Sequence, residues 1–584
     1  MTEWWRDGVV YQVYPRSFAD ASGDGVGDLA GLTARLDHIA GLGADAIWLT
    51  PFQRSPQKDH GYDVSDYIDV DPLFGDLAEF DAMLARAHEA GLRVVIDIVP
   101  NHCSSEHPVF QAALSGDASA RARFHFTDSP GPNSPGPNGP GPNGPGTGSP
   151  GTGSPGTGDP GTGDPGTGDP GVMPNNWPSV FGGPAWSRAP DGAWYLHLYA
   201  PEQPDWNWRD PRTAPFFDEV VRFWFDRGVD GLRVDVAHGL FKAPGLPSLP
   251  PGIEPEPGRL RGNPLACDQP ETPDVYRRWR AIADTYDPPR ILIGEVNLAP
   301  ERVARYVGAD RLHQAFAFGF VMAPWDADIW RETGEQLLRE RPVTWVVENH
   351  DVRRTPTRYS DSGAPTASHP TASQPDTSHP AAGHPAAGQP DAGPPGSSPP
   401  GSSPPNAGRA RAALITILGL PGAAYLYQGQ EYGLPEVDVP AEARQDPAWR
   451  RAGTSRDGCR VPLPWTESPA GAYGFSPPGA APPWLPVPDG WGAYLASPTL
   501  PLCRAAIALR RRLHADGVLS ADDPVLWSVD GDQRLIARRP GLTLVVAMGS
   551  APVALPPGTP LLTSSPLTAD GRLPQDAAAW LSTQ

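Results

Sequence analysis

Short apolar segments and helix-like segments alternate along most of this 584-residue chain, and this alternation limits the possible fold more than any other feature. Eight apolar runs have the length and residue types of buried strands: residues 9–14, 46–49, 92–100, 229–236, 291–296, 315–320, 343–347 and 423–427. Parallel strands that are covered on both faces have continuous apolar runs of this kind. Eight of them separated by helices predict an α/β fold, a (β/α)8 TIM barrel.

Amphipathic segments lie between these runs. In one of them Leu77, Phe80, Leu84 and Ala87 recur at helical spacing, and Gly91 follows as a stop signal. Similar patterns cover residues 216–226, 409–418 and 504–513. An open doubly wound sheet is the competing architecture, but no G-x-G-x-x-G turn follows the first predicted strand.

The connection after the third predicted strand is too long for a simple loop, so we expect an inserted subdomain at residues 101–185. Residues 1–100 and 186–515 would then form the barrel. After residue 515 the pattern changes to short β-like runs, which predict a small antiparallel β domain over residues 516–584.

Two tracts of five-residue repeats interrupt the pattern, at residues 131–170 and 361–405. Their units, such as GTGDP and GSSPP, hold few side chains that could form a core. We expect both tracts to be disordered loop expansions, one inside the inserted subdomain and one inside the barrel. A flexible lid or a docking arm is the alternative interpretation of such low-complexity segments.

The chain is strongly acidic, with 46 Lys and Arg against 67 Asp and Glu and a net charge of −21. Nucleic acids and anionic membranes would repel it, so neither is an expected partner. No apolar run reaches the ~18 residues of a membrane span, and no N-terminal targeting segment is recognisable. Four scattered cysteines suit neither a disulfide framework nor a zinc site. These features predict a cytoplasmic protein, and they leave its oligomeric state open.

Charged and polar residues gather where the predicted strands end. The segments are DHGYD (residues 59–63), DIVPNH (97–102), RVD (233–235), GEV (294–296) and ENHD (348–351). The carboxyl ends of barrel strands meet at one face, where the active sites of such proteins lie. Each residue alone has a structural explanation, because an Asp at a strand end is often a helix N-cap. Burying so many charges for stability alone would be costly, so the set predicts an active site.

This combination of carboxylates, histidines and one arginine suits the cleavage of an acetal. One carboxylate acts as nucleophile or base, and a second protonates the leaving oxygen. A third can bind sugar hydroxyls, and an arginine would keep the nucleophile ionised. The chemistry requires no cofactor, and neither a phosphate-binding loop nor a G-x-S-x-G motif points to another reaction.

The same segments, together with QPDWN at residues 203–207, resemble the motifs of the α-amylase family of glycoside hydrolases, family 13. They are most similar to its α-glucosidase and oligo-1,6-glucosidase branch, of the actinobacterial type. The resemblance implies a retaining double displacement with Asp235 as nucleophile, Glu295 as general acid/base and Asp351 as a carboxylate that binds the sugar and distorts its ring. It implies substrate-binding roles for Tyr62, Asp63, His102, Arg233, His350 and Arg460.

Arg460 resembles the arginine that pairs, in this branch, with the Asp63-type residue at the non-reducing end of the sugar. That pairing would close the pocket and make the enzyme exo-acting. We therefore expect an α-glucosidase that releases glucose from short oligosaccharides. Val236 resembles the valine of 1,6-cleaving members, whereas the surrounding segments resemble maltose-using enzymes, so we expect α-1,4 cleavage with α-1,6 as a side activity.

Two other functions stay open. A glucosyl-transferring or isomerising relative, such as a trehalose synthase or a sucrose-active enzyme, would use the same residues. A non-catalytic sugar-binding relative fits less well, because Asp235 and Glu295 are both present.

A second site is suggested by DASGDGVGD at residues 20–28, which places oxygens at alternate positions as calcium-binding loops do. A similar loop binds Ca²⁺ in the α-glucosidase branch, so the resemblance implies a structural Ca²⁺ or Mg²⁺ away from the active site. The alternative is a Gly/Asp turn that leads into a helix near Asp28. The candidate ligands are Asp20, Ser22, Asp24, Val26 and Asp28.

Overall fold

The computed structural model describes residues 3–127, 173–253, 255, 258–316, 318–339, 343–360 and 405–583. Eight parallel strands close into a barrel in the order β1–β13–β12–β11–β10–β9–β5–β2. They are β1 (Val9–Val13), β2 (Ala46–Leu49), β5 (Arg93–Ile98), β9 (Gly231–Val234), β10 (Ile291–Gly294), β11 (Gln314–Phe316), β12 (Val343–Val346) and β13 (Ala423–Tyr427). The predicted α/β fold, a (β/α)8 barrel, is confirmed.

Apart from the partly buried Arg93 at the start of β5, the barrel strands are buried along their whole length, which explains their continuous apolar sequences. Every residue of β1, β2, β9 and β10 is buried. In β2, Ile47 lies opposite both Tyr11 of β1 and Val94 of β5. The strand expected at residues 315–320 is shorter, since β11 ends at Phe316 and α8 (Phe318–Met322) begins soon after it. A short apolar run does not distinguish a strand from a buried helix.

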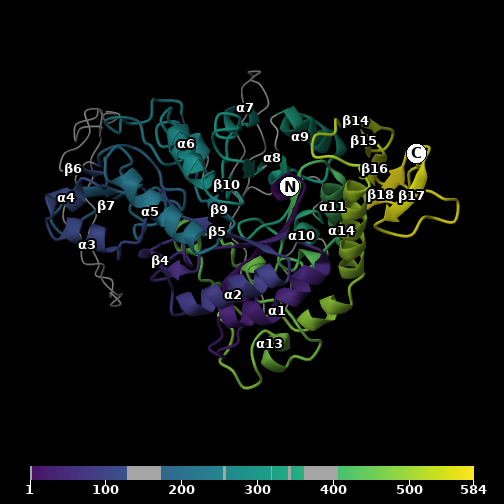
Figure 1. The fold of residues 1–584 in the computed structure, drawn as a ribbon, viewed down its shortest axis with the longest axis horizontal. Coiled ribbons are helices and arrows are strands. Elements are labelled where there is room, and N and C mark those ends of the chain that lie inside the picture. The colour runs from purple at the N-terminus through teal and green to yellow at the C-terminus, as the bar shows by residue number, and fades with distance from the viewer. Residues whose placement is uncertain are drawn as a thin grey trace, which may run out of the picture.

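Long helices surround the barrel (Figure 1). They are α1 (Leu29–Leu42), α2 (Leu77–Glu89), α5 (Thr213–Asp226), α6 (Thr272–Ala283), α9 (Ala327–Arg339), α11 (Ala407–Gly419) and α14 (Thr499–Ala515). The helical pattern predicted from Leu77 to Ala87 is confirmed as α2, and a capping box between Asp76 and Glu79 marks its start. Shorter helices are α7 (Pro300–Val303), α10 (Thr355–Arg358), α12 (Pro447–Ala452) and α13 (Ala470–Gly474).

The part of the β5–β9 connection that precedes α5 forms a separate unit at one end of the molecule (Figure 1). It holds α3 (Pro108–Leu114), α4 (Ala118–Arg121) and a sheet in the order β6 (Phe126–Thr127), β8 (Trp194–Leu196), β7 (Trp186–Arg188). This sheet continues to Leu196, beyond the boundary expected at residue 185, because strands of two or three residues leave no readable pattern. The repeat tract 131–170 lies outside the described residues, as does the tract 361–405 except for Pro405.

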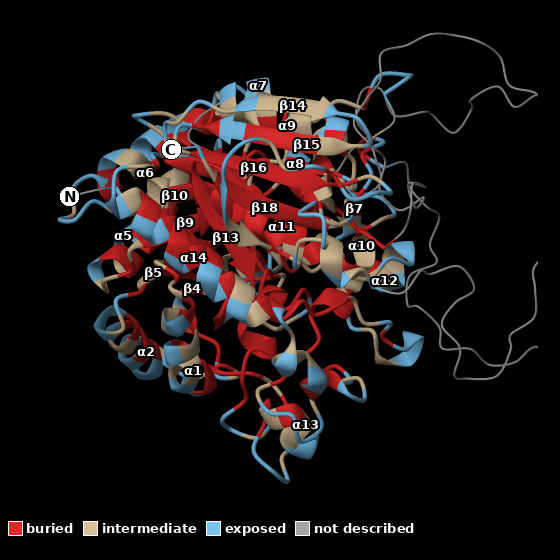
Figure 2. Cartoon of the chain, turned by 90° about the vertical axis from the view of Figure 1, so that its right-hand side faces the viewer, coloured by how far each residue is buried: buried red, intermediate tan, exposed pale blue. Residues whose placement is uncertain are grey.

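The C-terminal region is a five-stranded antiparallel sheet at the opposite end (Figure 1). Its order is β14 (Leu526–Asp530), β15 (Arg534–Arg539), β16 (Leu542–Ala547), β18 (Ala577–Ser582), β17 (Thr559–Thr563). The Trp580 indole donates a hydrogen bond of 2.9 Å to the Ile415 carbonyl of α11, and Figure 2 shows α11, β16 and β18 buried together. A two-stranded sheet of β3 (Gln53–Arg54) and β4 (Asp66–Val70) lies after β2. Among the described helices, none is both long and apolar enough to cross a membrane.

Candidate active site

Arg233, near the end of β9, brings together carboxylates from three neighbouring strands. Its guanidinium lies 2.8 Å from Asp235, 3.0 Å from Glu295 and 3.4 Å from Asp97. The exposed fraction of the side chains rises from 0% for Asp97 to 8% for Asp235 and 18% for Glu295. The cluster is therefore closed towards the barrel interior and open to a ligand at Glu295 and Asp235.

Asp97 forms the closed base of this cluster. Its carboxylate accepts hydrogen bonds of 2.9 Å from the Trp48 indole and 2.9 Å from the Tyr62 hydroxyl. Burial raises the pKa of Asp97 to about 7, against the opposing charge of Arg233. A carboxyl without solvent access cannot reach a sugar, so Asp97 supports Arg233 and Tyr62 and does not act on substrate.

The surroundings of Asp235 change its ionisation. Burial raises the pKa of Asp235 well above its ordinary value, the negative charge of Glu295 raises it further, and Arg233 opposes both. A pair of carboxyls, one ionised and one protonated, is what acid-assisted nucleophilic attack on an acetal needs.

Val236, directly after Asp235, has a strained backbone. Its φ of 44° lies in the left-handed region, which a β-branched residue rarely adopts. In this conformation its N–H donates a hydrogen bond of 3.0 Å to Glu295 Oε2. This conformation typically costs about 1–3 kcal/mol, and it directs an amide donor at Glu295, the predicted acid.

Asp351, after β12, faces two arginines. Its Oδ1 accepts hydrogen bonds of 3.1 Å from Arg456 and 2.9 Å from Arg460, and its Oδ2 lies 3.3 Å from His350 Nε2. Burial alone would raise the pKa of Asp351, but His350 and the two arginines hold it below its ordinary value. Asp351 is therefore an ionised carboxylate, and with 29% of its side chain exposed it is open to a ligand.

His350 is held between two barrel-side partners. Gln12 of β1 lies 2.7 Å from its Nδ1, and the Tyr62 hydroxyl lies 2.7 Å from its Nε2. Burial lowers the pKa of His350 to about 3, so the imidazole is neutral at physiological pH. Gln12 was not a sequence candidate, because a single polar residue inside a predicted strand carries no motif.

His102 joins the barrel to the inserted subdomain. Its Nε2 lies 3.1 Å from the Tyr62 carbonyl and 3.1 Å from Gln203 Nε2. Gln203 also donates a hydrogen bond of 3.0 Å to Asp59. Burial lowers the pKa of His102 to about 3, with Lys242 as a second cause. The QPDWN segment therefore supports the site from its rim.

The expected pairing of Arg460 with Asp63 is corrected by the structure. Both Asp63 oxygens turn back into their own loop, where they accept hydrogen bonds of 2.9 Å from Ser55 Oγ and from the backbone N–H groups of Lys58 and Asp59. No ion pair joins Arg460 to Asp63 within the described ranges. Such local capture of a carboxylate by nearby backbone amides is typical of Asp in turns.

Asp59 and Arg456 form the pair instead. The Arg456 guanidinium lies 3.0 Å from Asp59 and also contacts Asp351. Burial raises the pKa of Asp59 to about 6, and Arg456 opposes that rise. Asp59 opens the DHGYD segment, whereas Arg456 belongs to none of the candidate segments, and spacing alone did not show which Asp would meet which Arg.

The structure therefore brings most of the predicted residues into one network and leaves Asp63 outside its ion pairs. Joined by the contacts above are Asp235, Glu295, Asp351, Tyr62, His102, Arg233, His350 and Arg460. Sequence reasoning missed the supporting partners Gln12, Trp48, Asp59, Gln203 and Arg456.

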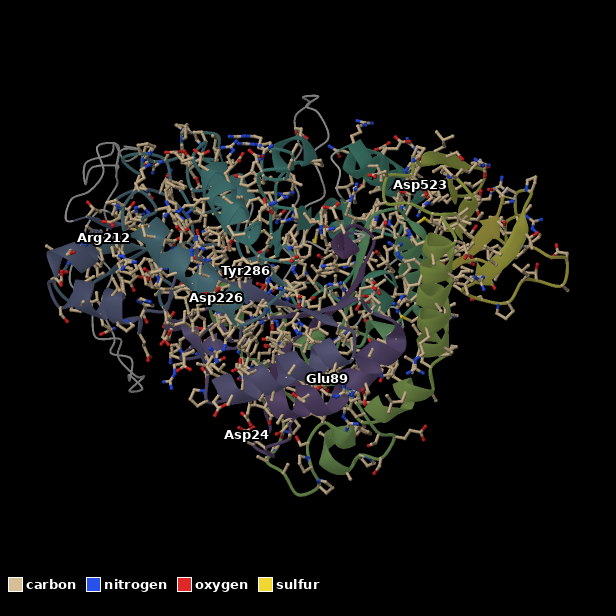
Figure 3. The ribbon with its side chains drawn as sticks, viewed as in Figure 1. Asp24, Glu89, Arg212, Asp226, Tyr286 and Asp523 are labelled. Atoms are coloured by element: carbon tan, nitrogen blue, oxygen red, sulfur yellow. The ribbon has the colours of Figure 1, made fainter. Side chains whose placement is uncertain are left out.

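The loop at residues 20–28 uses its oxygens differently from what the metal hypothesis requires. Asp20 Oδ1 accepts from the Gly23 N–H at 2.6 Å, and Asp28 caps α1 by accepting from the Gly31 N–H at 2.6 Å. Asp24 lies at the lower edge of the molecule (Figure 3). The described residues contain no group of three His, Cys, Asp or Glu that could hold a metal. As placed, these side chains fit a turn and a helix cap and do not fit a cation, so the metal stays a prediction.

A barrel that presents two carboxyls on one guanidinium and a third, ionised carboxylate at its rim has the groups that a glycoside hydrolase needs. Comparison with known proteins agrees. The family described as "Alpha amylase, catalytic domain" matches residues 12–373 and 404–497. This chain belongs to the α-amylase family.

Its relatives include sugar-processing enzymes. A probable alpha-glucosidase of Rhizobium meliloti (strain 1021) is 34% identical over 83% of this chain and 77% of its own. An oligo-1,6-glucosidase of Parageobacillus thermoglucosidasius is 29% identical over 83% of this chain and 78% of its own. The crystal structure of the alpha-glucosyl transfer enzyme XgtA is similar over the full length of both chains, with a TM-score of 0.78 and 30% identity.

Proposed function

We propose that this glycoside hydrolase is a retaining, exo-acting α-glucosidase that releases glucose from short oligosaccharides. The observation that carries the proposal is the position of Asp235 and Glu295 on one guanidinium, 2.8 and 3.0 Å from Arg233. Asp351 stands beside them as a third, ionised carboxylate. The alpha-glucosidase and oligo-1,6-glucosidase names of the relatives support the same substrate class.

The reaction takes place in two steps. An oxygen of ionised Asp235 attacks the anomeric carbon, the bond to the leaving oxygen breaks, and Glu295 gives that oxygen its proton. The product of this step is a glucosyl ester of Asp235. Glu295, now ionised, takes a proton from water, whose oxygen attacks the same carbon and frees Asp235 and glucose with the original configuration.

Arg456 supports exo action. It joins Asp59 to Asp351, with distances of 3.0 and 3.1 Å, and so connects the loop after β2 to the loop after β12. In this proposal the ion-paired bridge beside the catalytic carboxyls closes the pocket behind a terminal sugar and so excludes a continuing chain. Closing the pocket, which the sequence predicted for Asp63 and Arg460, is thus assigned to Asp59 and Arg456.

The decisive experiment follows maltose hydrolysis by proton NMR and compares rates on maltose, isomaltose, sucrose and trehalose. The proposal predicts glucose as product, with the α-anomer formed first, and the highest kcat/KM on maltose. Initial formation of β-glucose, or no glucose from any of the four sugars, would contradict it.

Glucosyl transfer is the second candidate, and the similarity to XgtA favours it. The same glucosyl-Asp235 ester would then react with a sugar hydroxyl and not with water. Product analysis at high maltose concentration separates the two functions, because transfer gives trisaccharides or trehalose and hydrolysis gives glucose alone.

A cytoplasmic location remains part of the proposal. All four cysteines are free and buried, which suits a reducing compartment. Fractionation of the producing cells tests it, and activity recovered only outside the cell would contradict it.

A further inference from the structure

Asp446 is a buried carboxylate that the mechanism above does not use. It directly precedes α12, and its side chain has no exposed surface. Asp446 Oδ2 accepts hydrogen bonds of 2.8 Å from Arg456 Nε and 2.6 Å from the Arg456 backbone N–H, and its Oδ1 accepts one of 2.9 Å from the same guanidinium. Arg456 holds the pKa of Asp446 below its ordinary value, although burial alone would raise it. The two side chains form a bidentate pair, the strongest geometry for such a contact.

The far side of the Arg456 guanidinium faces the active site. From there it donates to Asp59 at 3.0 Å and to Asp351 at 3.1 Å. Its carbon also lies 5.1 Å from the ring centre of Phe181, in the inserted subdomain. One side chain, anchored at one end by Asp446, therefore sets the place of two carboxylates that come from separate loops.

We propose that Asp446 is a positioning residue for recognition of the terminal sugar. It fixes Arg456, and Arg456 holds Asp59 and Asp351 at the separation that the sugar requires. This inference rests on the proposed α-glucosidase function and deepens it. Without Asp446 the guanidinium keeps partners only on its substrate side, so Arg456 would follow the movements of Asp59 and Asp351 and could not fix them.

The competing explanation is purely structural, because Asp446 also caps α12. Its Oδ1 accepts a hydrogen bond of 3.0 Å from the Ala448 N–H. Asp446→Asn separates the two roles. Asparagine has the same shape as aspartate and caps helices as well as aspartate does. It lacks the negative charge that holds Arg456, and its NH₂ group would face the N–H groups of the guanidinium.

The experiment measures kcat and KM on maltose for the full-length wild type, Asp446→Asn, Arg456→Ala and the double variant. A misplaced recognition group can cost about 100-fold, so we expect kcat/KM of Asp446→Asn to fall by about that factor, with KM raised at least about 10-fold. A loss of folded protein would lower kcat and leave KM unchanged. In the double variant we expect no further loss beyond Arg456→Ala, because Asp446 acts through Arg456.

Asp76→Asn is the matched control, because Asp76 caps α2 on the surface and takes part in none of the contacts above, so it should leave KM unchanged. Unchanged KM in Asp446→Asn, or losses from Asp446→Asn and Arg456→Ala that multiply in the double variant, would overturn the inference. Failure of the wild type to release glucose from maltose would instead overturn the proposed function, so the two failures are distinguishable.

Discussion

The active-site rim and the loop at residues 20–28 are both rich in carboxylates, yet they use them in opposite ways. In the loop, Asp20 and Asp28 accept hydrogen bonds from backbone amides three to seven residues away, such as that of Gly31. At the rim, Asp235 and Glu295 come from different strands and meet at Arg233. The loop carboxylates accept hydrogen bonds from N–H groups of their own loop. The carboxylates that the barrel brings together at the rim are instead open to a substrate.

The strongest test of this contrast is Asp235→Asn. Loss of the nucleophile should lower kcat on maltose by at least about 10⁴-fold, because no ester intermediate can form. The amide oxygen can still accept from Arg233, so we expect the melting temperature to stay within a few degrees of wild type. Activity close to wild type would show that the rim carboxylate is structural, like those of the loop.

Glu295→Gln should have a smaller effect that depends on the leaving group. General acid catalysis contributes about 10²–10⁴-fold, so we expect a fall in kcat of about 1,000-fold on maltose. A 2,4-dinitrophenyl α-glucoside, whose leaving group needs no proton, should lose far less in the glycosylation step. Equal losses on both substrates would contradict the assignment of Glu295 as the acid.

The buried histidines of the rim should make stability depend on pH. His350 keeps a pKa of about 3 in the folded protein, whereas an unfolded chain binds a proton below about 6.5. The free energy of unfolding should therefore decrease as pH falls from about 6.5 to 3, by up to about 1.4 kcal/mol per pH unit for each such histidine. Urea unfolding between pH 7 and 4 should give a shallower decrease for His350→Asn, and an identical decrease would contradict the buried neutral state.

The smallest effects are expected in the loop. Asp28→Ala removes the N-cap of α1 and should cost about 1 kcal/mol of stability without changing kcat/KM. Because the loop carboxylates are occupied by N–H donors, 1 mM CaCl₂ should leave the melting temperature of the wild type unchanged. A calcium-dependent rise in melting temperature that is lost in Asp24→Ala would restore the metal hypothesis and weaken the contrast.

Much of the fold was readable because buried parallel strands leave a strong pattern. The runs that became β2 and β13 were placed with the bounds that the structure shows, and the antiparallel C-terminal sheet followed from a change of period. The two- and three-residue strands of the insertion were not readable, since so few residues cannot show a period. β17 and β18 also went unmarked, and only the pairing of β18 with β16 and of β17 with β18 identifies them as strands.

The sequence by itself determined the barrel and singled out the candidate reactive residues, because the local residue types show which segments are buried and where each strand ends. Only the tertiary structure decided the partners: Arg456 with Asp59 and Asp446, Gln12 with His350, and the loop aspartates with their own backbone. The physical reason is that a hydrogen bond or ion pair depends on separations of about 3 Å between side chains. Residues hundreds of positions apart reach such separations only after the strands and loops have packed.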